Sequence, residues 1–147
     1  MSKVSFNYAD RKLPLKHKRK VQNFIPLIFS LEGKNLHRLN YVFCSDEYLL
    51  QINLKFLHHD TYTDIITFNL PQSNNSITGE IYISCDRVKE NALKYQEKLS
   101  EEFLRVIFHG VLHLCGYKDK RGVDIKTMRQ KEAFYIQMFH VKHKNLP

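Results

Sequence analysis

The sequence predicts a single α+β domain in which a small, mixed four-stranded sheet packs against about five helices. Two observations favour this fold class. Segments typical of strands occur only before residue 85, whereas the rest of the chain shows the apolar spacing of helices. The 147 residues contain no internal repeat and no linker, and they are enough for one hydrophobic core but too few for two. We therefore expect residues 1–147 to form one domain.

Four short segments rich in branched and aromatic residues predict the strands of this sheet. In the first, Val4, Phe6 and Tyr8 alternate with polar residues, which is typical of a half-buried strand. A Ser- and Asn-rich stretch lies between the last two and predicts a loop or hairpin tip. The predicted strands are residues 4–8, 39–44, 64–68 and 79–84, with the loop at 71–78.

Apolar residues spaced three and four apart predict five helices. Ser45 is a suitable N-cap for the second, Ser100 starts the fourth, and Asp124 can cap the fifth. Pro26 is expected to kink or split the first helix, because it removes a backbone donor. The predicted helices are residues 15–31, 45–56, 86–99, 100–116 and 124–140, with Phe56 and Tyr95 among the buried side chains and a frayed tail from Val141.

Composition narrows the possible partners. Hydrophobic residues make up 43% of the chain, and no apolar run approaches the length that spans a bilayer. The net charge is +8, and residues 1–40 alone carry +7, with nine Lys or Arg and two Asp or Glu. This basic segment fits a polyanion such as RNA, and it fits a solvated, solubilising helix face equally well. The amino terminus lacks the pattern of a signal peptide, so we expect a cytoplasmic protein.

Two histidines on one predicted helix provide the strongest chemical signal. His109 and His113 are four residues apart, so they project from the same helix face, one turn from each other. Gly116 is the residue type that ends a helix in the left-handed conformation, which lets Asp119 approach from a third direction. Two imidazoles and a carboxylate leave a tetrahedral divalent ion one open position for water. The pattern predicts a catalytic type of metal site at the end of a helix.

Neighbouring residues limit what this site can be. Cys115 points away from the histidine face, and with Cys44 and Cys85 it is expected to be a buried, reduced thiol. Gly110 occupies the position where an H-E-x-x-H zinc protease has its general base, so a protease is disfavoured. A hydrolytic site would need help from residues 58–64 or from Glu80. Each has an ordinary alternative role, as a turn cap or a solvent-facing strand position.

The histidine segment resembles the signature of the YbeY family, whose usual pattern is H-G-x-L-H-L-x-G-Y-D-H. Two further blocks agree in order and spacing. Asn53 and Phe56, followed by residues 63–68, are similar to the family's N-x-x-Y-R…P-T-D-V-L-S-F, and residues 79–83 are similar to its G-D-I-x-I strand. The resemblance covers roughly residues 39–139.

This resemblance implies a zinc-dependent single-strand endoribonuclease. Such an enzyme would act in maturation of the 3′ end of small-subunit ribosomal RNA and in ribosome biogenesis, with the small subunit as partner and no membrane. One divalent metal ion, expected to be Zn²⁺, would be held by His109, His113 and Asp119. The family's third ligand is His, so Asp119 adds a negative charge and predicts a weaker Lewis acid. Lys118 stands where the family has Asp.

A second departure concerns the substrate. The family Arg that engages the phosphate falls on Leu57, which cannot do so. Lys55, His58 or His59 could replace it from nearby, and the catalytic candidates are Lys55, His59 and Asp64, with no role assigned. The alternative is a non-catalytic ribosome-assembly or RNA-binding factor that the metal stabilises. The sequence leaves the oligomeric state open.

Overall fold

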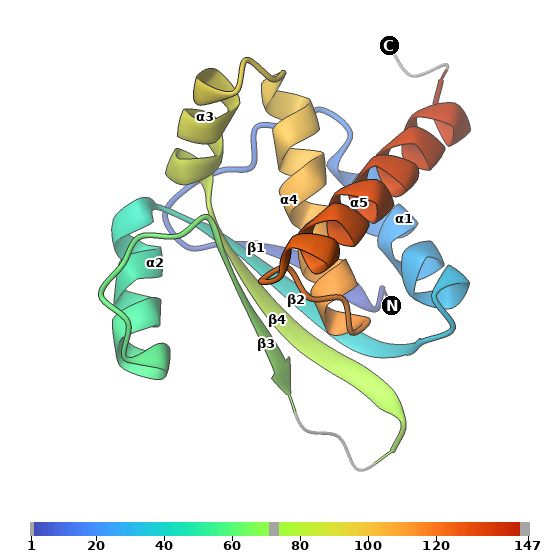
Figure 1. The fold of residues 1–147 in the computed structure, drawn as a ribbon, viewed down its shortest axis with the longest axis horizontal. Coiled ribbons are helices and arrows are strands. Elements are labelled where there is room, and N and C mark those ends of the chain that lie inside the picture. Colours follow the sequence, from blue (N-terminus) through green and yellow to red (C-terminus); the bar gives the residue numbers. More distant parts are fainter. Residues whose placement is uncertain (1, 71–73, 145–147) are drawn as a thin grey trace.

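The computed structural model describes residues 2–70 and 74–144, and they form one small α+β domain as predicted. Its sheet has four strands in the order β1-β2-β4-β3, and β1, β2 and β4 run parallel while β3 is antiparallel to β4 (Figure 1). A mixed four-stranded sheet is therefore confirmed. The strands are β1 (Val4–Tyr8), β2 (Asn35–Cys44), β3 (Ile65–Leu70) and β4 (Ser76–Ser84).

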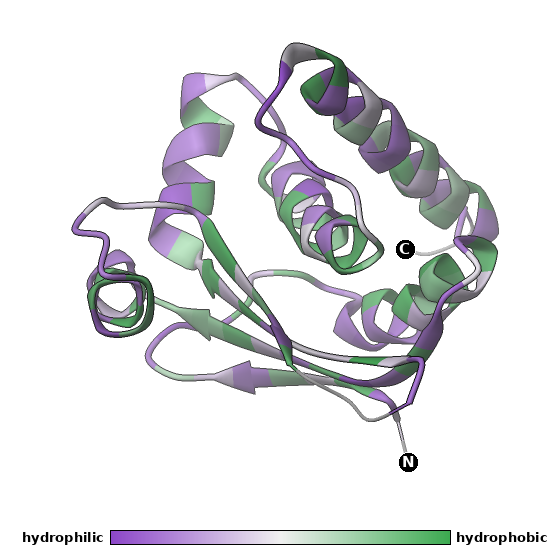
Figure 2. Cartoon of the chain, turned by 60° about the horizontal axis from the view of Figure 1, so that its bottom comes forward, coloured by the Kyte–Doolittle hydropathy of each residue, from purple (hydrophilic) through white to green (hydrophobic). Residues whose placement is uncertain are grey.

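Five α-helices surround this sheet, four of them on one face (Figures 1 and 2). The second helix is extended by a short π-helical turn, Asn53–Leu57, and packs against the opposite face. Within the described residues, no helix has the length and apolar character needed to cross a bilayer. The helices are α1 (Lys18–Leu31), α2 (Asp46–Ile52), α3 (Cys85–Lys94), α4 (Leu99–Leu114) and α5 (Gly122–Lys142).

The main core lies between the sheet and the four-helix layer. Successive side chains of a strand point to opposite faces, so Tyr41 and Ile81 face the helices, whereas Tyr82 faces α2. Helix α4 is central to this core, and the buried Tyr41 hydroxyl donates a hydrogen bond to the Ile107 carbonyl at 2.7 Å. A smaller cluster of Cys44, Leu49 and Ile66 fills the space under α2.

Gly110 lets α4 lie unusually close to the sheet. A Cβ at this position would lie 2.6 Å from Ile81 Cδ1 and 3.1 Å from Ile65 Cδ1, closer than atoms normally approach. The helix is thereby pressed against β4 and β3 at the turn that separates His109 from His113. This contact positions both histidines at the β3 edge of the sheet.

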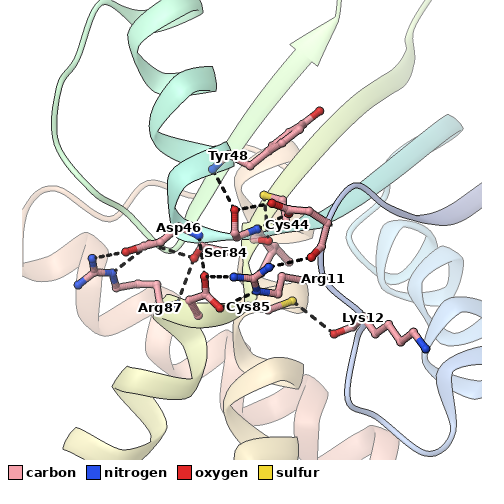
Figure 3. A network of polar contacts seen from close by, with 12 residues as sticks. Arg11, Lys12, Cys44, Asp46, Tyr48, Ser84, Cys85 and Arg87 are labelled. Carbon is pink, nitrogen blue, oxygen red and sulfur yellow. Dashed lines mark hydrogen bonds and ion pairs between the residues drawn. The ribbon is translucent and has the colours of Figure 1, made fainter.

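A polar network joins the carboxyl ends of the parallel strands to the helices that follow them (Figure 3). Ser45 is the N-cap of α2, as predicted, and its hydroxyl accepts from the Tyr48 amide at 3.1 Å. Arg87 of α3 donates to Asp46 at 2.7 Å, and Asp86 accepts from the Asp46 amide at 3.0 Å. These contacts fix where α2 leaves the sheet and so where the π-helical turn lies.

Several predicted boundaries were wrong. Helix α1 begins at Lys18, not residue 15, and it runs through Pro26 without a break, because buried side chains on both sides of the proline hold it on the sheet. Strands β2 and β4 begin at Asn35 and Ser76, earlier than predicted, because they pair with each other from these residues onward. The predicted loop was therefore wrong over residues 76–78, and its residues 71–73 lie outside the described chain.

Helix α3 ends at Lys94, earlier than predicted, in a left-handed turn at Gln96 with φ of 55°. The Glu97 amide donates to the Ala92 carbonyl at 2.9 Å, which closes a Schellman motif without glycine. This turn leaves Tyr95 61% exposed, so the prediction that it is buried was wrong. Helix α4 then begins at Leu99, with Lys98 rather than a serine at its N-cap.

Two further corrections concern α5 and α2. Arg121 is the N-cap of α5, so Asp124 lies in its first turn and does not cap it. The helix continues through Val141 to Lys142, because buried Phe139 anchors its last turns, and residues 145–147 lie outside the described chain. Phe56 meets the edge of the Phe68 ring but remains 54% exposed, contrary to the burial predicted for it.

Candidate metal centre

Helix α4 and the turn after it bring together His109, His113 and Asp119. One ligand atom from each lies within 4.8 Å of the other two. Asp119 Oδ2 is 3.1 Å from His109 Nε2 and 3.3 Å from His113 Nε2. The two imidazole rings are 4.5 Å apart and nearly perpendicular. Among the described residues, no other group of His, Cys, Asp or Glu has this geometry.

The chain reverses immediately after the helix. Gly116 has φ of 106°, and the Tyr117 amide donates to the Leu112 carbonyl at 3.0 Å, so α4 ends in a Schellman motif. A residue with a Cβ would be strained at this φ. The turn returns the chain toward the histidine face and places Asp119 there. Cys115 stays outside the group as a buried thiol, and burial raises the pKa of its Sγ to about 12.

Hydrogen bonds fix how both imidazoles are oriented. His113 Nδ1 lies 3.0 Å from the Tyr117 carbonyl oxygen, which can only accept, so this nitrogen carries the proton. His109 Nδ1 lies 2.5 Å from Glu132 Oε2 and donates in the same way. In neutral imidazoles this arrangement leaves the lone pair of each Nε2 directed at Asp119. Metal-binding histidines are oriented in this manner.

The donor atoms fit a cation. Each Nε2 lone pair lies 3.1 or 3.3 Å from the Asp119 carboxylate oxygen, and these electron-rich atoms repel when no positive charge lies between them. A divalent ion removes this repulsion, and two nitrogens with one carboxylate oxygen form a set that zinc accepts. The side chains are 13%, 27% and 37% exposed, so the group is open to solvent on the Asp119 side. The arrangement can therefore bind a metal and leave a position accessible.

Glu132, from α5, is a site residue that sequence reasoning missed. Its side chain is only 2% exposed and lies between His109 and the guanidinium groups of Arg105, at 3.5 Å, and Arg129, at 3.3 Å. A sequence signal existed. Glu132 follows buried Met128 by four residues, so a carboxylate interrupts the apolar face of α5. Such a carboxylate needs a buried partner, and His109 is that partner.

Arg105 links Glu132 to the strand side of the site. Burial disfavours its charge, but hydrogen bonds to Glu102, at 2.7 and 3.0 Å, and the nearby carboxylates of Glu132 and Asp64 outweigh this effect and raise the pKa of the guanidinium. Asp64 lies 3.9 Å away. The carboxylate behind His109 is thus charge-balanced by a permanently protonated neighbour.

A cavity of about 660 Å³ opens beside the three residues. His59 and Asp64, two of the predicted catalytic candidates, line it, and so does Leu57. The third, Lys55, is not among its lining residues, and its ammonium lies 5.3 Å from the centre of the Phe56 ring. The structure therefore places two of the three candidates with the metal group.

Glu80 and His58, which the sequence offered as possible helpers of the metal site, do not line the cavity. Glu80 is paired with Phe68 across β3 and β4, on the face under α2, and accepts a hydrogen bond from Tyr82 at 3.3 Å. The α4 face carries the metal group, so Glu80 is separated from it by the sheet. His58 has left-handed φ of 56° at the end of the π-helical turn and is absent from the lining.

Comparisons with known proteins agree with this geometry. The sequence model of the family described as "Endoribonuclease YbeY" matches residues 4–140. A relative with that name from Flavobacterium johnsoniae is 42% identical over 139 residues, covering 95% of this chain and 99% of the relative. One from Cytophaga hutchinsonii is 44% identical over 129 residues, covering 88% and 90%, and one from Porphyromonas gingivalis is 42% identical over 138 residues, covering 94% and 91%.

A solved structure shares the architecture as well. The solution structure of a Thermotoga maritima protein superposes with a TM-score of 0.65 at 25% sequence identity, covering 97% of this chain and 93% of the other. The family match spans all four strands and all but the last residues of α5, including each residue of the metal group. The resemblance seen in the histidine segment is confirmed over the whole fold: the chain belongs to the YbeY family of endoribonucleases.

Proposed function

We propose that this chain is a metal-dependent endoribonuclease that cuts single-stranded RNA, with Zn²⁺ held by His109, His113 and Asp119. The observation that carries the proposal is the orientation of both imidazoles. Glu132 accepts a hydrogen bond from His109 Nδ1, and the Tyr117 carbonyl accepts one from His113 Nδ1. Both Nε2 atoms therefore face Asp119 at the mouth of the cavity. Membership of an endoribonuclease family supports the reaction class.

The donor set supports zinc among divalent ions. Two imidazole nitrogens favour zinc over magnesium or calcium, which prefer all-oxygen sites. When bound, such an ion supplies Lewis-acid chemistry, since it acidifies water and polarises a phosphoryl oxygen. With three protein ligands, the position facing the cavity remains open for this purpose.

The residues of the cavity supply proton transfer and orientation. Asp64 and His59 line the cavity but are not in the ligand group, and both side chains can accept or donate a proton there. We assign them to orienting the attacking water and protonating the leaving oxygen. Lys55 remains a candidate only for RNA outside the cavity, because its ammonium lies over Phe56.

The proposed substrate is the small-subunit ribosomal RNA near its 3′ end, and the proposed partner is the small ribosomal subunit in the cytoplasm. The +7 charge of residues 1–40 supports a polyanionic partner. We further propose that residues 1–147 work as one hydrolase domain, because the elements that line or support the site are spread along the chain, from the π-helical turn through β3 and α4 to α5.

Leu57 favours a second candidate function. It lines the cavity with a hydrocarbon side chain that cannot bind a phosphate, which fits a factor that assembles on RNA without cutting it. This alternative predicts association with the small subunit that persists when a metal ligand is removed.

An assay for cleavage of a labelled single-stranded RNA by zinc-loaded protein distinguishes the endoribonuclease from the non-cutting assembly factor. The wild type and a His37→Ala control, which alters an exposed histidine on β2, are expected to cut the RNA. His113→Ala is expected to lose cleavage while its circular dichroism spectrum stays native. If the wild type carries stoichiometric metal yet leaves RNA intact with zinc, manganese and cobalt, the enzyme proposal is wrong and subunit association becomes the function to measure.

A further inference from the structure

The metal cavity has an unusual charge balance for a site that must receive RNA. Apart from the histidines, its ionisable lining residues are Asp64, Asp119 and Lys120. Two carboxylates repel a phosphodiester anion. The Asp119 carboxylate would also offset part of the positive charge of a bound metal ion. Among the described residues that line the cavity, Lys120 is the sole Lys or Arg. Any further positive charge for the substrate must come from this side chain or from outside the cavity.

The nearest buried cation cannot supply it. Arg105 is held by Glu102 at 2.7 Å and lies within 3.9 Å of both Glu132 and Asp64, and it does not line the cavity. Its guanidinium is thus committed to balancing three carboxylates. Leu57 contributes only hydrocarbon to the cavity wall. Neither residue is available to a phosphate.

Lys120, in contrast, is exposed and directly follows Asp119. No hydrogen bond or ion pair engages its ammonium among the residues that the structure describes. A lysine is a mobile point charge with three donors, and it binds phosphate without a fixed geometry. Lys120 lines the same cavity as His109 and His113.

We propose that Lys120 is the phosphate-binding residue of this site, holding the RNA phosphodiester that lies against the metal group. The proposal rests on the proposed function, since it assigns the substrate contact within the same cavity. It also accounts for a site that lacks a cation at position 57: the charge is supplied from the turn after α4 instead of from the end of the π-helical turn.

Lys118 provides a matched control. It carries the same charge, is exposed in the same turn and flanks Asp119 on the other side, but it does not line the metal cavity. It lines a neighbouring cavity, which also borders His113, Asp119 and Lys120. Removing either lysine changes the net charge equally. Only loss of a specific contact in the metal cavity makes Lys120→Ala differ from Lys118→Ala.

The experiment measures binding of a short single-stranded RNA to zinc-loaded protein by fluorescence anisotropy over a range of salt concentrations, and gel electrophoresis of each sample checks that the RNA is still intact when the anisotropy is read. The logarithm of the association constant falls as the logarithm of the salt concentration rises, and one lost phosphate contact makes this slope less steep by about 0.7. The loss corresponds to roughly fivefold weaker binding at about 0.1 M salt. We expect this change in Lys120→Ala, near wild-type binding in Lys118→Ala, recovery in Lys120→Arg, and wild-type zinc content in all three.

The outcomes separate the two proposals. If Lys118→Ala lowers affinity and slope as much as Lys120→Ala, the effect is general electrostatics and the assignment of Lys120 is overturned. Loss of zinc from Lys120→Ala would also overturn it, because the residue would then act through Asp119. If wild-type protein does not cut RNA but Lys120→Ala alone weakens binding with an altered slope, the nuclease proposal fails and the phosphate contact stands.

Discussion

Replacing Glu132 with Gln tests whether the charge behind His109 sets the metal affinity. The substitution keeps the shape of a side chain that is 2% exposed, and an amide oxygen can still accept from His109 Nδ1. It removes the negative charge that makes His109 Nε2 a stronger electron-pair donor to a metal ion. Changing such a hydrogen-bond partner of a ligand typically costs 10- to 100-fold in metal affinity, which is about 1.4–2.7 kcal/mol.

The same substitution affects the metal-free fold. Arg105 keeps Glu102 at 2.7 Å but loses the Glu132 charge 3.5 Å away. We expect the free energy of unfolding of the metal-free protein to fall by about 1–3 kcal/mol, the usual cost of weakening a buried hydrogen bond to a charged group.

Zinc affinity is measured by competition with a chromophoric chelator, and stability by urea denaturation of the metal-free protein. Glu97→Gln, which removes the same charge from an exposed position after α3, is the control and should match the wild type in both assays. If Glu132→Gln binds zinc within twofold of the wild type, the carboxylate does not tune the ligand and this account of the site is refuted.

Two further predictions concern the scaffold. Burial opposes the charge of Glu32, but hydrogen bonds from Tyr135, Tyr117 and a lysine outweigh it and lower the pKa of the carboxyl below its usual 4.5. A lowered folded-state pKa adds stability that is fully present above the unfolded-state pKa, so Glu32→Gln should destabilise the protein in urea at pH 7. The difference should shrink as the pH falls from 4.5 through the lower folded-state pKa. Equal destabilisation at pH 7 and pH 3 would contradict this. Gly110→Ala should cost about 1–3 kcal/mol in thermal unfolding, because the new Cβ meets Ile81 Cδ1 at 2.6 Å. Ile81→Val removes that atom and should relieve part of the cost, and full additivity of the two changes would argue against the clash.

Local patterns predicted the fold class, most of the helices and strands, and the grouping of the three candidate ligands, because each of these depends on neighbours in sequence. The spacing of His109 and His113 and the glycine after them involve one helix and its turn. The N-cap at Ser45 is equally local. The order of the strands and the extension of β4 back to Ser76 depend on pairing between distant segments, and the pattern of one segment does not contain that information.

The partners of two further residues at the site also depend on packing between segments, so the sequence does not show what these residues contact. Glu132 reaches His109 only because α5 packs across α4, and Lys120 enters the cavity only because of the path that the chain takes after Gly116. Position 57 shows the opposite case. Its importance was evident from the family pattern, and the structure adds that its side chain does line the cavity.

The central claim is that His109, His113 and Asp119 hold one metal ion. Elemental analysis of purified protein, after equilibration with zinc and removal of free ion, tests it directly. We predict about one zinc per chain in the wild type and in His37→Ala, and a large loss in both His113→Ala and Asp119→Ala. Wild-type protein without bound metal, or Asp119→Ala with undiminished zinc content and affinity, would contradict the account.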